Sequence, residues 1–93
     1  MTAETLEKKA IKEYLKLKGF FVYHNLAGLG CKRGLADLTA IKNGVVYQIE
    51  VKVGKGKQSD NQKEFQAEWE EAGGIYISGG IDQVIDKLKK LNH

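Results

Sequence analysis

The dipeptide Asn43-Gly44 stands between two runs rich in apolar and β-branched residues, and it constrains the fold more than any other feature of the chain. An Asn-Gly pair in this position is the strongest short-range signal of a two-residue β-hairpin turn. The sequence therefore predicts antiparallel strands at residues 37–42 and 45–53, with Lys42 paired to Val45. The turn also fixes the register, since a slip by one residue would move every side chain to the other face of the sheet.

The remaining elements follow from helical spacing, capping residues and glycines. Besides the hairpin we expect helices at 2–18, 59–72 and 81–91, strands at 20–26 and 75–78, and a loop with three glycines at 27–34. Ser59 and Gln62 fit a capping box at the start of the second helix. The order αβββαβα predicts an α/β fold, with a mixed β-sheet flanked by helices, in a single domain over residues 1–93.

The single cysteine excludes an intrachain disulfide framework and a cysteine-based zinc site. No apolar run approaches the ~20 residues of a membrane span, and the N-terminal stretch has no signal-peptide core. With 29% charged and 42% hydrophobic residues, the composition is that of a folded domain rather than a disordered chain. A soluble cytoplasmic protein without membrane contact is the default expectation.

The net charge of +3 is mild, but the basic residues are unevenly placed. Lys32 and Arg33 stand in the Gly-rich loop, and Lys55 and Lys57 follow the second hairpin strand with no acid beside them. A solvated surface of mixed charge is the simpler interpretation. The alternative is that the two basic loops lie together and face a polyanion.

Two carboxylates and an ammonium are expected on one face of the hairpin. The register places Asp37 opposite Glu50, with Cβ atoms ~4.5–5.5 Å apart, and the alternation of the strand puts Lys52 on the same face. Like charges so close destabilise a sheet unless something neutralises them. Mg²⁺ or Mn²⁺ would do so, because both prefer oxygen ligands and take carboxylates together with water and phosphate. An exposed cross-strand network of these side chains is the alternative.

Lys52 has a candidate role in this site, and two further side chains are candidates to join it. Lys52 would lie near a metal-activated water, which it could orient, or it could stabilise charge on a phosphate. Glu7 lies at the edge of the apolar stripe of the first helix, where it could add a carboxylate or simply reach solvent. Gln62 could hold a water or a phosphate oxygen, or serve only as the capping-box partner of Ser59.

Other polar patterns point less clearly to chemistry. The run Gly54-Lys55-Gly56-Lys57 lacks the spacing and the Ser or Thr of a P-loop, so no nucleotide cofactor is expected. His24 and Asn25 could reach a substrate, although a histidine with its hydrogen bonds satisfied in the strand is the simpler interpretation. Phe65 and Trp69 are expected in the core rather than as base-stacking groups.

Taken in order, these residues resemble the virus-type replication-repair nuclease (VRR-NUC) domain, a branch of the PD-(D/E)XK nuclease superfamily. The resemblance covers essentially the whole chain and rests on Glu7, Gly34-Leu35-Ala36-Asp37, Glu50-Val51-Lys52, Ser59 and Gln62 in αβββαβα order. The Glu-x-Lys tripeptide alone is common by chance, whereas the ordered set is much more specific. The family often has Pro before the aspartate, where this chain has Ala36.

The resemblance implies a restriction-endonuclease-like core and a magnesium- or manganese-dependent endonuclease. Asp37, Glu50 and the backbone carbonyl of Val51 would bind the metal, and Glu7 would complete the acidic site directly or through water. Lys52 would assist the nucleophilic water. Each of these roles is an expectation carried over from the family by position.

The resemblance also implies partners. Stand-alone, phage-encoded members, which this chain matches best, resemble Holliday junction resolvases and act as homodimers on branched DNA. Strand 20–23 and the last helix are candidates for the dimer surface. The alternatives are a flap-type nuclease and a non-catalytic DNA-binding module on the same fold. Gln62 would hold the site from its helix, and DNA phosphates would be contacted by Lys32, Arg33, Lys55, Lys57 and Ser59.

Overall fold

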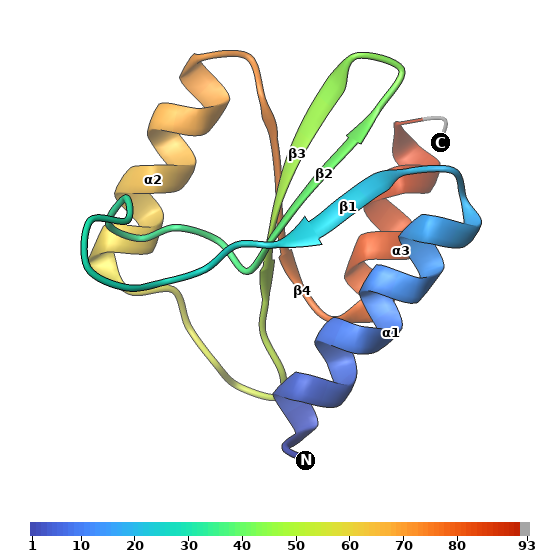
Figure 1. Cartoon of the computed structure of the whole chain (residues 1–93), viewed down its shortest axis with the longest axis horizontal. Helices are drawn as coiled ribbons and strands as arrows, with labels where there is room; N and C mark the ends of the chain where they lie inside the picture. Colours follow the sequence, from blue (N-terminus) through green and yellow to red (C-terminus); the bar gives the residue numbers. More distant parts are fainter. Residues whose placement is uncertain (92–93) are drawn as a thin grey trace.

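Two layers of helices enclose a four-stranded sheet in the computed structural model, which describes residues 1–91. Figure 1 shows α1 and α3 against one face of the sheet and α2 against the other. The elements are α1 Ala3–Leu17, β1 Phe21–His24, β2 Leu38–Lys42, β3 Val45–Val51, α2 Asp60–Glu71, β4 Ile75–Gly79 and α3 Ile81–Lys90. The predicted order αβββαβα and the α/β class, with a mixed sheet flanked by helices, are confirmed.

The β2–β3 hairpin has the register that its turn predicts, and the regular pairing continues outward to Leu38 opposite Ile49. Asn43 and Gly44 both have positive φ, 52° and 79°. A type I′ turn requires positive φ at both central residues, which is why Asn-Gly is favoured there. The turn chemistry therefore sets which side chains of β3 face α1 and α3 and which face α2.

Asp37 lies one residue before β2 rather than inside it, which corrects the predicted strand start and its regular pairing with Glu50. The Asp37 N–H donates to the carbonyl of Ile49 at 3.0 Å, so the hydrogen-bond pattern is displaced by one residue at this point. β1 and β3 are also shorter than expected and end at His24 and Val51. Beyond both strands the chain leaves the sheet through glycine-containing loops (Figure 1).

β4 runs parallel to β3, and the connection between them passes through α2. Parallel neighbours require such a crossover, because a tight turn cannot join them. In the ladder Glu50 pairs with Ser78 and Val51 pairs with Gly79. The last residues of β3 therefore lie beside the start of α3, at the end of the sheet where the N-terminus of α1 is found (Figure 1).

The main hydrophobic core fills the space between the sheet and the pair α1 and α3. It is formed by buried side chains of all four strands and both helices: Ile11, Leu15, Phe20, Val22, Leu38, Ala40, Tyr47, Ile49, Val51, Ile77, Val84 and Leu88. A smaller cluster beneath α2 contains Phe65 and Trp69, as predicted, and the Trp69 Nε1 donates to the Ile75 carbonyl at 2.9 Å. Within residues 1–91, no helix combines the length and the apolar character needed to cross a membrane.

Gly34, in the Gly-rich loop, packs closely against the backbone at the start of α2. Its φ is +73°, and an added Cβ would overlap the backbone carbonyl of Asn61. Gly34→Ala is therefore expected to lower the free energy of unfolding by more than about 1 kcal/mol, because both the backbone conformation and the contact are lost. Urea denaturation measures this, with Gly28→Ala as control, since nothing lies within 4 Å of that position. Equal stability of the two variants would contradict the packing described here.

Candidate active site

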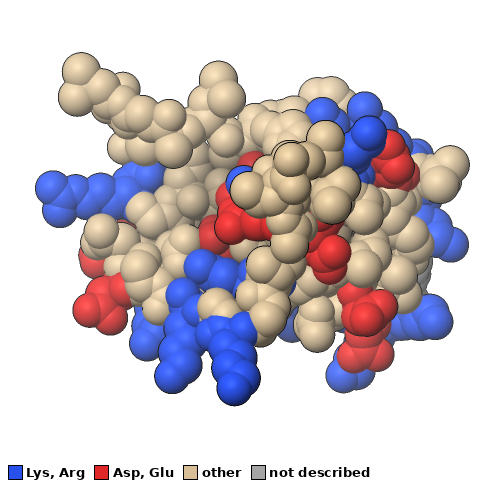
Figure 2. Space-filling view, turned by 90° about the horizontal axis from the view of Figure 1, so that it is seen from below, with Lys and Arg blue, Asp and Glu red and all other residues tan. Residues whose placement is uncertain are grey.

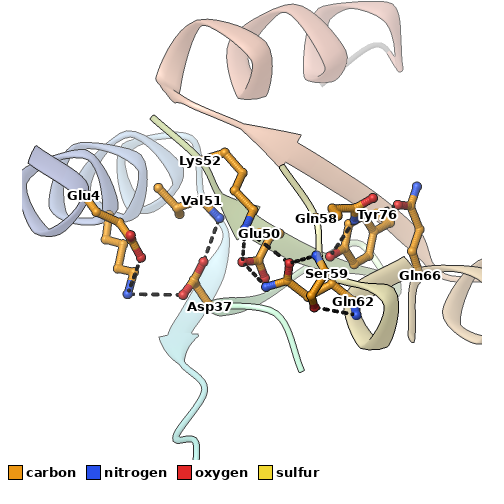
Figure 3. Close-up of polar contacts among 11 residues, drawn as sticks. Glu4, Asp37, Glu50, Val51, Lys52, Gln58, Ser59, Gln62, Gln66 and Tyr76 are labelled. Carbon is orange, nitrogen blue, oxygen red and sulfur yellow. Dashed lines mark hydrogen bonds and ion pairs between the residues drawn. The ribbon is translucent and has the colours of Figure 1, made fainter. Parts of the chain in front are cut away.

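Asp37 is held at the end of the Gly-rich loop by contacts of both carboxylate oxygens. Oδ2 accepts the Val51 N–H at 2.7 Å, and Oδ1 lies 3.1 Å from the Nζ of Lys8 on α1. The same Lys8 ammonium is 3.3 Å from a carboxylate oxygen of Glu4. Figure 3 shows Asp37 between Glu4 and Glu50, so the loop, α1 and β3 meet at this side chain.

A polar network inside the sheet holds the backbone that carries Asp37. The Asn25 N–H donates to the Asp37 carbonyl at 2.8 Å, and the Asn25 amide donates to the carbonyl of Ala36 at 3.0 Å and to Gln48 Oε1 at 2.9 Å. Thr39 donates to Asn25 Oδ1 at 2.6 Å and accepts from the Gln48 amide at 2.7 Å. The sequence suggests that Asn25 could reach a substrate. In the structure its hydrogen bonds instead hold the backbone that carries Asp37.

Glu50 is a buried carboxylate, only 4% exposed. Its Oε1 accepts from the Gln62 amide at 2.7 Å and lies 3.6 Å from the Lys52 Nζ. Its Oε2 is buried and has no hydrogen-bond partner among the described residues. Burial, and then the charge of Asp37, raise the pKa of Glu50 to about 7, although Lys52 opposes the shift. Burying an ionised carboxylate lowers the stability of the folded protein when one of its oxygens has no hydrogen-bond partner.

Gln62 is the capping-box partner of Ser59, and its side chain also hydrogen-bonds to two residues of the candidate site. Its backbone N–H donates to Ser59 Oγ at 3.2 Å, and its Oε1 accepts the Ser59 N–H at 2.9 Å, which completes the capping box. The same Oε1 accepts from Lys52 Nζ at 3.2 Å while the amide nitrogen donates to Glu50. The helix start therefore fixes the orientation of the amide, and the amide fixes Glu50 and Lys52 (Figure 3).

The structure places Glu7 on the N-terminus of α3 rather than beside the other two carboxylates. Its Oε2 accepts the Ile81 N–H at 2.9 Å, where a negative charge is favoured by the helix dipole. It still lines, with Lys52 and Gln83, an open cleft of about 390 Å³ at this end of the sheet. Within residues 1–91 no three His, Cys, Asp or Glu side chains come together as a metal-binding group. Participation of Glu7 through a water therefore stays a prediction.

The predicted DNA-contacting residues fall into two groups. Lys55 and Lys57 are exposed in the β3–α2 loop, close to the cleft, and Ser59 caps α2. Lys32 instead pairs with Glu68 of α2 at 3.2 Å, and Arg33 lines a hollow beside the same helix. Figure 2, which views the molecule from the end of the sheet where α1 begins, shows acidic side chains near the middle with basic side chains on more than one side of them.

The donors at this site fit a hard divalent cation. Asp37 and Glu50 offer carboxylate oxygens from neighbouring elements, and the carbonyl of Val51 belongs to the residue whose N–H binds Asp37. The partnerless Oε2 of Glu50 is the kind of buried group that a cation would satisfy. Mg²⁺ and Mn²⁺ prefer such oxygen ligands, so these three residues are the candidates to hold the ion.

Lys8 is the site residue that the sequence did not indicate. It lies on α1 far along the chain from Asp37, and only the packing of α1 against the sheet brings its ammonium to the aspartate. Its spacing from Glu4 suggests a salt bridge within the helix, which the structure contains. No local pattern reveals the second, long-range partner.

Comparisons with known proteins agree with this fold. The sequence matches no family model and no curated protein. A solved structure described as a VRR_NUC domain matches with a TM-score of 0.79 and 25% sequence identity, covering 100% of this chain and 100% of that chain. The full-length match and the αβββαβα architecture together support the predicted resemblance to the VRR-NUC domain and its restriction-endonuclease-like core.

Proposed function

We propose that this chain is a divalent-metal-dependent endodeoxyribonuclease that hydrolyses phosphodiester bonds in branched DNA, with four-way junctions as the favoured substrate and a homodimer as the active form. The observation that carries the proposal is Glu50, a buried carboxylate with one partnerless oxygen, held beside Asp37 and Lys52. A purely structural role would leave this costly arrangement without a cause.

In the proposed hydrolysis, the cation and the residues around it have different roles. A divalent cation held by Asp37, Glu50 and the Val51 carbonyl would polarise a phosphoryl oxygen and make water a better nucleophile. In the hydrolysis a water oxygen loses a proton as it bonds to phosphorus, the bond from phosphorus to one ester oxygen breaks, and that oxygen takes up a proton. Lys52, held by Gln62 and Glu50, can donate a hydrogen bond to the attacking water or to the phosphate.

The homodimer is supported by an unusual surface on the edge strand β1. Phe21 and Tyr23 are 66% and 45% exposed, and their rings lie 5.7 Å apart. Exposed apolar edge strands are common sites of association between chains, and a two-fold dimer would present two identical sites to the two strands of a junction. Sedimentation of the wild type and of a Phe21→Ser, Tyr23→Ser variant tests the dimer.

The activity is tested by incubating the protein with labelled four-way junction, flap and linear duplex DNA. Each substrate is combined with Mg²⁺, Mn²⁺ or a chelator. We expect cleavage only with metal, and fastest for the four-way junction. Cleavage of the flap alone would identify the flap-type alternative. Metal-independent binding without cleavage of any substrate would instead identify a non-catalytic DNA-binding module.

Lys55 and Lys57 are expected to bind DNA phosphates next to the site without reading sequence. The variant Lys55→Ala, Lys57→Ala should bind all sequences more weakly, and the slope of log K against log salt concentration should fall by about 1.8, or 0.9 for each lost contact. Binding in chelator measures this without cleavage. An unchanged slope would place the DNA path elsewhere.

A further inference from the structure

A second basic surface lies along α1 and shares no residue with the cleft beside Lys52. Seven residues line this hollow of about 380 Å³: Thr5, Lys8, Lys9, Lys12, Glu13, Lys16 and His24. Four of them are lysines and one is an acid. We call Lys8, Lys12 and Lys16 the α1 lysine row, since they follow one another at spacings of four residues.

The helix arranges the row as a line of charge. Residues four apart lie on the same side of a helix and ~6 Å apart along its axis, so the three side chains leave the helix at regular intervals over ~12 Å. Lys8 has carboxylate partners in Glu4 and Asp37. No carboxylate lies within 4.0 Å of the Lys12 or Lys16 ammonium among residues 1–91. These two charges are therefore available to an external anion.

The pKa of His24, which lines the same hollow, is affected by the lysines of the row. Partial burial and then the charges of Lys12 and Lys8 lower the pKa of His24, and Lys16 acts in the same direction. The charge of Asp37 opposes the shift. His24 is therefore expected to be neutral at pH 7, able to donate or accept a hydrogen bond at the rim of the hollow.

The row begins at the candidate metal site. Lys8 Nζ lies 3.1 Å from Asp37 Oδ1, and Lys12 and Lys16 continue from it along α1 toward the C-terminal end of the helix. A polyanion that reaches Asp37 and Glu50 could therefore extend directly onto α1. Apolar side chains are absent from the lining of the hollow, whereas a helix that binds a lipid surface needs an apolar face.

We infer that the α1 lysine row binds the phosphate backbone of a DNA arm leading away from the Asp37–Glu50 site. The inference rests on the proposed nuclease function for the identity of the polyanion. Lys12 and Lys16 supply the charge, and Thr5 and His24 offer uncharged hydrogen-bonding groups beside them. This surface is additional to the β3–α2 loop, so that two separate basic surfaces adjoin the site.

The test is the double variant Lys12→Gln, Lys16→Gln, which leaves Lys8 and the site untouched. Its control is Lys87→Gln, Lys89→Gln, which removes the same charge from exposed positions on α3. Binding of a labelled four-way junction is measured in chelator over a range of salt concentrations. We expect the α1 variant to bind about tenfold more weakly and its salt slope to fall by about 1.8, with a smaller change in the control.

A third variant, Lys12→Arg, Lys16→Arg, keeps the charge and should bind like the wild type. The inference is overturned if the α1 variant keeps wild-type affinity and slope, if the α3 control loses as much, or if the wild type binds no DNA. Because binding is measured without metal, this result is separate from the cleavage assay. A wild type that binds through α1 but never cuts would refute the proposed nuclease function alone.

Discussion

Asp37→Asn should lower the rate of metal-dependent DNA cleavage by about 10²–10³-fold, since a divalent cation contributes several kcal/mol to the stability of the charged transition state. The amide oxygen can still accept the Val51 N–H, so the loop should stay in place. The amide nitrogen offers no negative charge to a cation, nor to Lys8. Loss of metal binding with retained structure is therefore the expected result.

Single-turnover cleavage of a four-way junction in Mg²⁺ measures this effect, and DNA binding in chelator shows whether the surface is intact. Lys52→Ala should also slow cleavage by about 10²–10³-fold through a different loss, that of a hydrogen-bond donor to the reacting groups. Asp86→Asn, an exposed change on α3, is the matched control and should cut like the wild type. An Asp37→Asn variant that folds and cuts at the wild-type rate would refute the proposed site.

The part of the structure that the sequence predicts well is the part set by neighbouring residues. Asn43-Gly44 dictates the hairpin register because its turn demands two positive φ angles. Ser59 and Gln62 predict the start of α2 because the capping box is completed within one turn. These local rules are enough to place Glu50 and Lys52 at the end of β3, near the start of α2.

What the sequence could not show depends on contacts between distant segments. The one-residue offset at Asp37 arises where Asn25 and Val51 hold it from two other elements. The partner of Glu7 is the first turn of α3, which is 74 residues away in the sequence. Helical spacing places Glu7 at the margin of the core but does not predict which segment its carboxylate contacts. The contact of Lys8 with Asp37 likewise joins two segments that are distant in the sequence.

Glu50→Gln should stabilise the metal-free protein at high pH by about 3 kcal/mol, which is the cost of keeping this carboxylate ionised when folding raises its pKa from 4.5 to about 7. Because the folded state holds the Glu50 proton more tightly, the wild type loses stability as pH rises from about 4.5 to about 7. Below that window both proteins carry a neutral group at position 50 and should be similar in stability.

Urea denaturation in chelator at acidic and alkaline pH measures the difference, with Glu64→Gln, an exposed change on α2, as the control for removing a carboxylate. The Glu50→Gln advantage should grow with pH, whereas the control should change little. Mg²⁺ at alkaline pH should stabilise the wild type and not Glu50→Gln, because a ligand stabilises only the folded state that binds it. If Glu50→Gln is no more stable than the wild type at alkaline pH, or Mg²⁺ stabilises both equally, Glu50 is not the strained carboxylate that a cation relieves.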